Sequence, residues 1–210
     1  MDRDDVIAQL SDPGRTVLDR RPAQMPSSSD SDVEYEAYQQ ALEQVWEELE
    51  YFPVPDSTLK DTEAVSFENT WQAERTYGGK RKHEGCDLIP EKEESGYYPV
   101  ISMTDGTVER AGWLEKGGWR IGIRSDNGNY YYYAHLESYV GDWKEGDQVQ
   151  AGDLLGYMGD SGYGPEGTTG QFPVHLHVGI YMPLGVEDEL AINPYWMLKY
   201  LEEKKVKWDY

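Results

Sequence analysis

The chain has little cysteine, few basic residues and no long apolar run. A single cysteine, Cys86, among 210 residues excludes an intrachain disulfide framework and a metal cage built from several thiolates. Only 19 Lys and Arg stand against 40 Asp and Glu, which gives a formal net charge of −21. Phosphate neutralisation needs basic side chains, so this balance argues against nucleic acid as a partner. It also argues against adhesion to anionic membrane surfaces.

The longest apolar stretches fall well short of the roughly 20 residues that span a membrane, so we expect no direct membrane insertion of this chain. The N-terminus, MDRDDVIAQL, is charged from its second residue and lacks the basic-then-apolar pattern of a secretory leader. Two expectations stay open on these observations: a cytosolic protein, or an envelope protein whose leader or anchor is absent from this sequence.

Composition divides the chain into three parts. Residues 1–31 contain DPGR and RRPAQMPSSSDSD and are expected to form a disordered or linker segment. Residues 32–65 are expected to form an amphipathic helix, up to about residue 50, and a connector that begins at YFPVP. We expect the apolar stripe of this helix to pack on the main domain or on a partner. Residues 66–210 are expected to form one domain.

Short β-like runs alternate with turn signals from about residue 66 onward. The turn signals TDGT, EKGG and SDNGN supply the Gly, Asn and Asp that tight hairpins need. A last helix is predicted at NPYWMLKYLEEKK, with Asn193 as its N-cap and Pro194 as its first residue. The predicted fold class is mainly β: a compact antiparallel β-sheet or sandwich-like domain with an N-terminal helix and a C-terminal helix. The predicted strands are YYPVISM, TVERAGWL, WRIGIRS, YYYYAHL, DQVQAG, LLGYMG and PVHLHVGIY.

Histidine is scarce, with four in the whole chain, and two of the four, His175 and His177, are separated by a single residue. On a strand these two side chains point to the same face, with their Cα atoms roughly 6.5–7 Å apart. Leu176 between them is expected to point into the core. Taken alone, the pair favours a strand with two structural histidines over a metal site.

The remaining histidines and one aspartate change this balance. His83 stands four residues before Asp87 in a glycine-rich segment that we interpret as a loop entering a strand, and His135 lies in YYYYAHLES. Zinc binds imidazole nitrogen and carboxylate oxygen, and a catalytic zinc site keeps one position open for water. Two histidines and one aspartate would supply the three ligands of such a site. Because no His-Glu-x-x-His string occurs, a catalytic base has to come from elsewhere, and two further histidines are available.

The motifs HEGCD, YYAHL, GDSG and HLH follow one another in the order and approximate spacing of the LytM/lysostaphin-type zinc metallopeptidases. The chain resembles this family over roughly residues 66–198. The resemblance implies that residues 66–210 form a zinc metallopeptidase domain with the compact β-sheet of this family, the duplicated hybrid motif fold. It also implies a substrate groove that runs across the sheet.

The same resemblance assigns the site residues. It implies that His83, Asp87 and His177 hold a Zn²⁺ cofactor. It implies that His135 and His175 act on the attacking water and on the developing tetrahedral intermediate. Zinc lowers the pKa of a bound water to about 7, and a histidine beside it can take up or release a proton. Which of the two histidines is the general base stays open.

Three neighbouring residues receive a minor role or none. Tyr133, two residues before His135, is expected to share its face and to be within reach of the intermediate. Ser161 in GDSGYG is interpreted as a loop residue and not as a nucleophile. Cys86, next to Asp87 on an extended segment, is expected to point away from the metal.

The resulting hypothesis is a zinc-dependent endopeptidase that hydrolyses amide bonds in the stem peptides or cross-bridges of bacterial peptidoglycan. The alternative is a non-catalytic or sporulation-type envelope scaffold that regulates other cell-wall hydrolases. Both functions predict an extracellular or cell-envelope location in a bacterium. The helix at 32–50 is then a surface that an envelope protein could contact. We also hypothesise that residues 1–65 cover the substrate groove.

Overall fold

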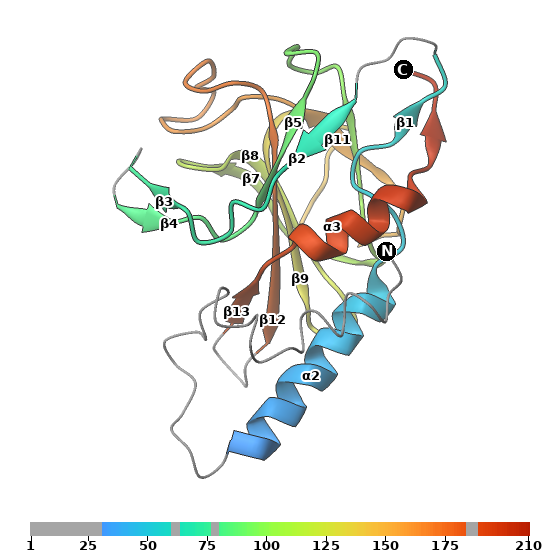
Figure 1. Ribbon diagram of the computed structural model, residues 1–210. Coiled ribbons are helices and arrows are strands. Elements are labelled where there is room, and N and C mark those ends of the chain that lie inside the picture. Colours follow the sequence, from blue (N-terminus) through green and yellow to red (C-terminus); the bar gives the residue numbers. More distant parts are fainter. Residues whose placement is uncertain (1–30, 60–63, 77–79, 184–188) are drawn as a thin grey trace.

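The computed structural model describes residues 31–59, 64–76, 80–183 and 189–210. Within these ranges the chain forms one large antiparallel sheet with two helices against it (Figure 1). The fold class predicted from the sequence, mainly β with one helix before and one after the strands, is confirmed. The predicted linker at residues 1–31 lies almost entirely outside the described residues.

The main sheet has the strand order β10-β7-β8-β9-β12-β5-β2, with β13 paired to β12 and β11 paired to both β9 and β6. Two small pairs lie apart from it, β1 with β14 and β3 with β4. The strands are β1 (Asp56–Ser57), β2 (Val65–Phe67), β3 (Glu74–Arg75), β4 (Arg81–Lys82), β5 (Cys86–Pro90), β6 (Pro99–Ile101), β7 (Gly106–Leu114), β8 (Gly118–Arg124), β9 (Tyr130–Tyr139), β10 (Gln148–Val149), β11 (Leu154–Met158), β12 (Leu176–Pro183), β13 (Glu189–Ile192) and β14 (Lys207–Trp208).

All seven predicted β-like runs contain a strand of the structure, from β6 to β12. The predicted turns EKGG and SDNGN connect β7 to β8 and β8 to β9, where the strands pair as antiparallel neighbours. Strands β1, β2, β3, β4, β13 and β14 were not predicted. Each is two to four residues long, and runs of that length carry too little alternation to be distinguished from loops.

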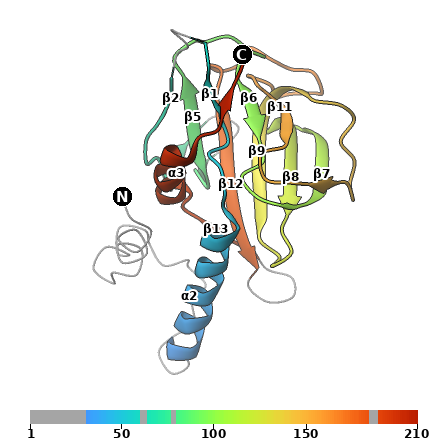
Figure 2. The same ribbon diagram turned by 90° about the vertical axis from the view of Figure 1, so that its right-hand side faces the viewer.

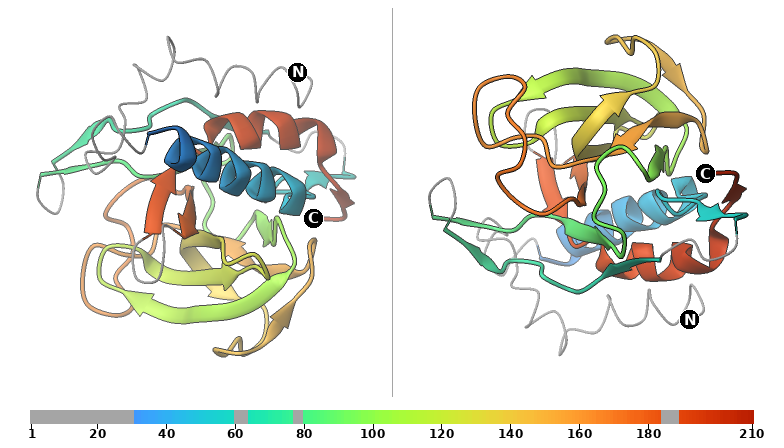
Figure 3. Two further views of the ribbon diagram at one scale, coloured as in Figure 1. Left: turned by 90° about the horizontal axis from the view of Figure 1, so that it is seen from below. Right: turned by 90° about the horizontal axis from the view of Figure 1, so that it is seen from above.

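The two helices are α2 (Ser31–Glu48) and α3 (Tyr195–Leu201), and a short 3₁₀ turn (Glu202–Lys204) follows α3. They lie side by side against the sheet (Figure 3), where the rings of Trp46 and Tyr200 meet edge to face with centroids 5.5 Å apart. The side chains of Leu42, Val45, Trp46 and Leu49 are buried in the same apolar cluster as the sheet residues. The first part of α2 extends beyond the edge of the sheet (Figure 2).

The C-terminal helix begins at Tyr195, one residue later than predicted. Asn193 nevertheless supplies the expected cap, because its Oδ1 accepts a hydrogen bond from Tyr195 N at 3.1 Å. Of the helices in the described ranges, neither has the length and apolar character needed to cross a membrane.

The helices pack against one face of the sheet, and His177 lies on the opposite face. Tyr131 on β9 points toward the helices, where its hydroxyl donates to Glu48 Oε2 of α2 at 2.7 Å. Tyr131 pairs with Ile180, whereas His177 lies three residues before Ile180 on β12 and therefore points to the opposite face. The described part of α2 thus lies behind the sheet as seen from His177. The hypothesis that residues 1–65 cover the site is wrong for this helix.

Candidate metal centre

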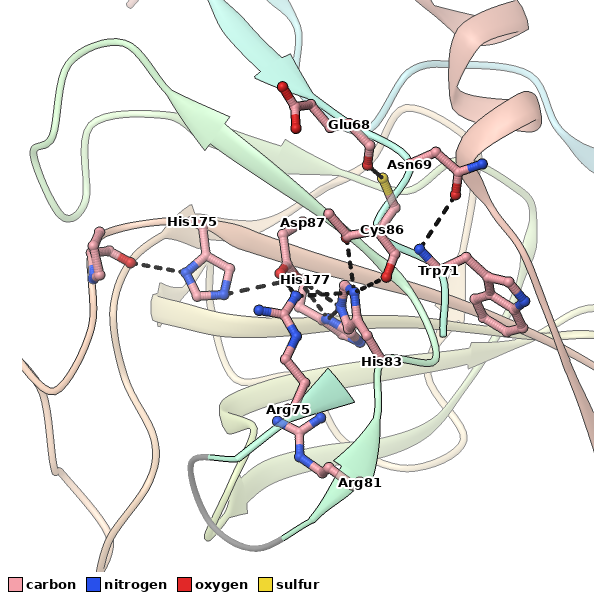
Figure 4. A network of polar contacts seen from close by, with 12 residues as sticks. Glu68, Asn69, Trp71, Arg75, Arg81, His83, Cys86, Asp87, His175 and His177 are labelled. Carbon is pink, nitrogen blue, oxygen red and sulfur yellow. Dashed lines mark hydrogen bonds and ion pairs between the residues drawn. The ribbon is translucent and has the colours of Figure 1, made fainter. Parts of the chain in front are cut away.

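Three side chains converge on the face of the sheet that lies opposite the helices. Asp87 on β5 and His177 on β12 are paired neighbours, and His83 reaches them from the loop between β4 and β5, as predicted. Asp87 Oδ1 lies 2.9 Å from His177 Nδ1 and 3.1 Å from His83 Nε2 (Figure 4). The two ring nitrogens lie 3.1 Å apart. The structure therefore brings together the three residues that the sequence analysis grouped as metal ligands.

The geometry of these donors fits a zinc ion. Three atoms separated by 2.9–3.1 Å can all lie about 2 Å from one point, which is the usual distance from zinc to imidazole nitrogen and carboxylate oxygen. Two nitrogen lone pairs that face one carboxylate oxygen repel each other and the oxygen unless a cation or a proton lies between them. Among the described residues, these three form the group of side chains that could hold a metal ion.

The carboxylate of Asp87 is held in its charged form. Burial opposes its ionisation, but hydrogen bonds from His177 and His83 outweigh burial and hold the pKa of Asp87 well below its usual range. Its second oxygen, Oδ2, accepts a hydrogen bond from Arg75 Nη2 at 2.5 Å. One carboxylate oxygen thus faces the two histidines, and Arg75 fixes the other. Burial also lowers the pKa of His177, which favours the neutral ring that metal binding requires.

The ring of His83 is oriented through its second nitrogen, Nδ1, which lies 3.0 Å from Thr70 Oγ1. A metal held by Nε2 would leave the ring proton on Nδ1, from which the threonine hydroxyl can accept it. Arg75 Nη2 also lies 3.0 Å from Nδ1, but both groups are donors, so the hydrogen bond of Arg75 is the one to Asp87. The sequence analysis missed Thr70 and Arg75, since no spacing rule relates the segment NTWQAER to the histidines.

Gly85 allows the ring of His177 to lie close to the chain that carries the other two donors. A Cβ atom at position 85 would lie 2.6 Å from His177 Nε2 and 2.7 Å from the carbonyl oxygen of Val178. The ring is held by Asp87 and the carbonyl belongs to a strand, so neither can move away at low cost. The glycine in HEGCD is therefore a geometric requirement of the site.

His135 reaches this face through an irregularity in β9. Its φ is 64°, in the left-handed region that residues other than glycine seldom adopt. Residues 130–134 pair with β12, whereas residues 136–139 pair with β11, so the strand changes neighbours at His135. The register against β8 shifts at the same place, as in a β-bulge. The bulge turns the imidazole of His135 toward the site and away from the core.

The rings of His135 and His175 are held in matching ways. His135 Nδ1 lies 2.8 Å from the carbonyl oxygen of Ser161, and His175 Nδ1 lies 2.9 Å from that of Pro173. A carbonyl accepts, so each Nδ1 carries a proton, and in the neutral form of either ring Nε2 keeps a lone pair. The ring centroids are 4.6 Å apart, and His175 Nε2 is 4.0 Å from Asp87 Oδ1. Burial, reinforced by the charge of His175, lowers the pKa of His135 to about 3, so this ring is neutral near pH 7.

The prediction that Tyr133 faces the site is wrong. Its side chain is fully buried, and its hydroxyl accepts a hydrogen bond from Met103 N at 2.8 Å in the core. The prediction assumed regular alternation between residues 133 and 135, and the bulge at His135 interrupts this alternation. Tyr132 lies on the site face instead, with its ring centroid 6.0 Å from that of His177.

Two aromatic side chains from the segment before β12 cover the pair of free histidines. The ring centroid of Phe172 lies 4.6 Å from that of His135 and 5.1 Å from that of His175. Tyr163 stacks on His135 at 6.1 Å, and its hydroxyl accepts a hydrogen bond from Arg81 of β4. The sequence analysis singled out neither aromatic residue, because both lie in a loop whose path the motifs do not define.

The side chains of Cys86 and Ser161 take no part in the site, as the sequence predicts. Cys86 is buried on the core side of β5 with its Sγ 3.6 Å from Glu68 O, and burial raises the pKa of the thiol to about 12. Ser161 is fully buried, and its Oγ donates to Leu136 O at 2.5 Å. Its carbonyl orients His135, so the role of this serine is structural.

A β-sheet domain that gathers two histidines and an aspartate beside two further histidines has the arrangement expected of a metallopeptidase. The family model described as Peptidase family M23 matches residues 81–194, a span that includes all five of these residues. The chain therefore belongs to peptidase family M23.

Comparison with characterised relatives places the chain more closely within this family. It is 43% identical over 146 residues to the L-Ala--D-Glu endopeptidase of Bacillus subtilis (strain 168), a match that covers 69% of this chain and 41% of that protein. The lysostaphin of Staphylococcus simulans is 39% identical over 67 residues, which cover 31% of this chain and 13% of that protein. The chain thus spans well under half of the length of these relatives.

A solved structure extends the likeness to nearly the whole chain. A protein of Ruminococcus gnavus ATCC 29149, described provisionally as a glycyl-glycine endopeptidase lytM, superposes with a TM-score of 0.79 at 47% sequence identity. The match covers 98% of this chain and 88% of that one.

Proposed function

We propose that this protein is a zinc-dependent endopeptidase that hydrolyses amide bonds in peptidoglycan peptides. The observation that carries the proposal is the convergence of His83, Asp87 and His177 at 2.9–3.1 Å beside two imidazoles whose Nε2 atoms are free. Three protein ligands leave the fourth tetrahedral position of zinc to water or substrate, which is the pattern of a catalytic site and not of a structural one.

In this proposal His83 Nε2, Asp87 Oδ1 and His177 Nδ1 hold the ion. A bound zinc ion supplies two effects: it lowers the pKa of water from 15.7 to about 7, and it polarises a carbonyl group. Arg75 orients Asp87 through Oδ2, and Thr70 orients the ring of His83 through Nδ1.

His135 and His175 carry the proton transfers. His135 is neutral near pH 7 and presents Nε2 as an acceptor, and the neutral form of His175 does the same, so either ring can take a proton from the attacking water. A ring that has gained this proton becomes a donor, and it can stabilise the oxyanion or protonate the leaving amine. Phe172 and Tyr163 pack against these rings and exclude water from them, which strengthens both interactions.

The names of the relatives support the substrate class. An L-Ala--D-Glu endopeptidase and a lysostaphin are among the characterised proteins that this chain resembles. A peptidoglycan substrate implies an extracellular or cell-envelope location in a bacterium. The scaffold function remains the alternative, with the exposed surface of α2 as the contact for an envelope partner, but no contact in the described residues favours it over catalysis.

The proposal is tested by metal analysis together with peptide release from purified peptidoglycan. We expect about one zinc per chain and release of peptides that a chelator stops and added zinc restores. His175→Ala should keep the zinc and lose most of the release, whereas Gln148→Ala, an exposed residue on β10, should behave like the wild type. Bound zinc without cleavage of any wall type would favour the scaffold alternative. Release that persists unchanged in His175→Ala would contradict the catalytic role of this residue.

A further inference from the structure

Arg120, on β8, differs from the other arginines in the described ranges. Its Nη1 atom is buried and has no hydrogen-bond partner there. An N–H of a charged group that is withdrawn from water without an acceptor costs free energy, and a chain with 40 acidic residues has many carboxylates that could have been placed beside it. Arg81 Nε is likewise buried without a partner, but the other arginines in these ranges each donate to a carboxylate or a hydroxyl: Arg75 to Asp87, Arg81 to Tyr163, Arg110 to Glu145 and Arg124 to Glu109.

The position of Arg120 in the sheet places it on the site face. Gly122 on β8 pairs with Tyr132, so these two residues share a face, and Arg120 stands two residues before Gly122 on that same face. In the register of β8 and β9, Arg120 lies opposite the bulge that begins at Ala134, and Ala134 is the sheet partner of His177. Two strand spacings, about 9.5 Å, therefore separate the backbone of Arg120 from that of His177.

Tyr130 and Tyr132 are neighbours of Arg120 on this face of the sheet. A Cβ atom at Gly122 would overlap the phenol of Tyr130, so that ring lies across the glycine beside Arg120. Burial raises the pKa of Tyr132 and of Tyr130, and the positive charge of Arg120 opposes the rise in both, which places the charge close to both hydroxyls. Arg120 thus lies in a partly apolar environment where a charged hydrogen bond is stronger than in water.

The side chain of Arg120 can reach substrate residues that lie close to the scissile bond. An extended peptide advances about 3.3 Å per residue, so a substrate whose scissile bond lies beside His177 and Asp87 has its next one to three residues within reach of the Arg120 fork. A carboxylate on one of those residues would be an acceptor for the Arg120 guanidinium, in the geometry that arginine and carboxylate share.

We propose that Arg120 is a specificity-determining residue that binds a carboxylate of the substrate peptide, so that the enzyme selects acidic peptides over neutral, glycine-rich ones. The inference deepens the proposed peptidase function and rests on it. The formal charge of −21 makes a local cation necessary, because the field of the whole protein does not attract an anionic substrate. At physiological salt, screening weakens interactions between charges that lie more than about 8 Å apart. The guanidinium of Arg120 is therefore the dominant charge for a carboxylate bound beside it.

The test uses three synthetic peptides. The first is L-Ala-γ-D-Glu-L-Lys-D-Ala amide, whose one carboxylate is the α-carboxylate of the D-glutamyl residue. The second replaces that carboxylate by an amide but has a free C-terminal carboxylate, and the third is pentaglycine amide. Values of kcat/KM are measured for the wild type, Arg120→Gln and Arg120→Lys, with Arg110→Gln as a matched control that removes the same charge from an exposed position on β7.

We expect the wild type to cleave one of the two carboxylate peptides about 10- to 100-fold better than pentaglycine, the range of a charged hydrogen bond. A preference for the first peptide would show that Arg120 binds an acidic residue within the peptide chain. A preference for the second would show that it binds a C-terminal carboxylate. Arg120→Gln should lose this preference with unchanged zinc content and no fall in melting temperature. Arg120→Lys should keep part of the preference, and Arg110→Gln should keep it all.

A preference that survives in Arg120→Gln would overturn the inference, as would an equal loss on all three peptides or a wild type that prefers pentaglycine. Failure of the peptidase proposal is separated by calorimetric binding to zinc-loaded His175→Ala. Tighter binding of a carboxylate peptide that depends on Arg120 supports the inference even where no peptide is cleaved. Equal binding of all three peptides to His175→Ala and to the double variant with Arg120→Gln overturns it.

Discussion

The imidazoles of His135 and His175 lie 4.6 Å apart, and a main-chain carbonyl holds each of them through Nδ1. The two histidines come from different parts of the chain and from different backbone conformations. His175 precedes β12 and forms a single bridge with Gly159, whereas His135 lies at the bulge of β9. The same outcome, an imidazole held through Nδ1 with Nε2 left for proton transfer, is thus reached twice, which is the geometry that paired proton transfer needs.

Removal of either imidazole should therefore lower catalysis without release of the metal. We expect His175→Ala and His135→Gly each to reduce kcat about 10²- to 10⁴-fold, the usual contribution of a general acid or base. Glycine is chosen at position 135 because it adopts the positive φ of this residue without strain. Zinc stoichiometry measured on the same samples should stay near one per chain, and His177→Ala should lose the metal. Loss of zinc from His175→Ala would instead make that residue a ligand.

The resemblance to the LytM/lysostaphin-type family assigned His83, Asp87 and His177 as ligands, and the structure brings these three side chains together. His83 and Asp87 flank the entry into one strand, and His177 lies on another strand in the HLH motif. Alternation along β12 also correctly predicted that Leu176 is buried. The strand runs and their Gly/Asn turns predicted the antiparallel sheet for the same reason, since each of these signals is local.

The features that the sequence did not predict depend on register between distant strands. The left-handed conformation at His135 exists because β9 leaves β12 and joins β11 at that residue, and nothing in YYYYAHL encodes the position of β11. The assignment of Tyr133 to the site face was wrong for this reason. Thr70 and Arg75 were missed because their contacts with the site are made in three dimensions only. The division of the chain at residue 65 stays a prediction.

The carboxylate of Glu48 should anchor α2 to the sheet. Its two oxygens accept hydrogen bonds from three side chains of the β8–β9 hairpin: Ser125 at 2.8 Å, Asn129 at 2.9 Å and Tyr131 at 2.7 Å. Glu48→Ala leaves three donors without this acceptor, and we expect the free energy of unfolding in urea to fall by about 2–4 kcal/mol. Tyr131→Phe should cost about 1 kcal/mol.

Glu43→Ala is the matched control for this prediction, because it removes the same charge from an exposed position of the same helix. It should change the free energy of unfolding by less than about 0.5 kcal/mol. Zinc affinity should be the same in all three variants, since α2 and the site lie on opposite faces of the sheet. An effect of Glu48→Ala no larger than that of Glu43→Ala would show that the anchor contributes nothing.

The ion pair between Glu109 and Arg124 should make stability depend on pH. A hydrogen bond from Arg124, opposed by partial burial, lowers the pKa of Glu109 below its ordinary value. The stabilisation is therefore present above the unfolded pKa of about 4.3 and is lost as the pH falls through the lower folded value. Glu109→Gln should melt at a lower temperature than the wild type at pH 7, and the difference should close below about pH 4. A difference in melting temperature that is constant from pH 7 to pH 3 would contradict this origin.

Arg75 should set the affinity of the site for metal, although it contacts no metal itself. It fixes Asp87 Oδ2 at 2.5 Å and so leaves Oδ1 in place between the two histidines. Without Arg75, the carboxylate can rotate and has to be ordered when the metal binds. Removal of a hydrogen-bond partner of this kind typically costs about 10- to 100-fold in metal affinity. We expect Arg75→Gln to raise the zinc Kd by about that factor in competition with a chelator of known affinity. Thr70→Val should have a similar effect through His83, whereas Arg110→Gln should leave the Kd unchanged. If Arg75→Gln binds zinc as tightly as the wild type but turns over more slowly, Arg75 acts on the substrate and not on the ligand.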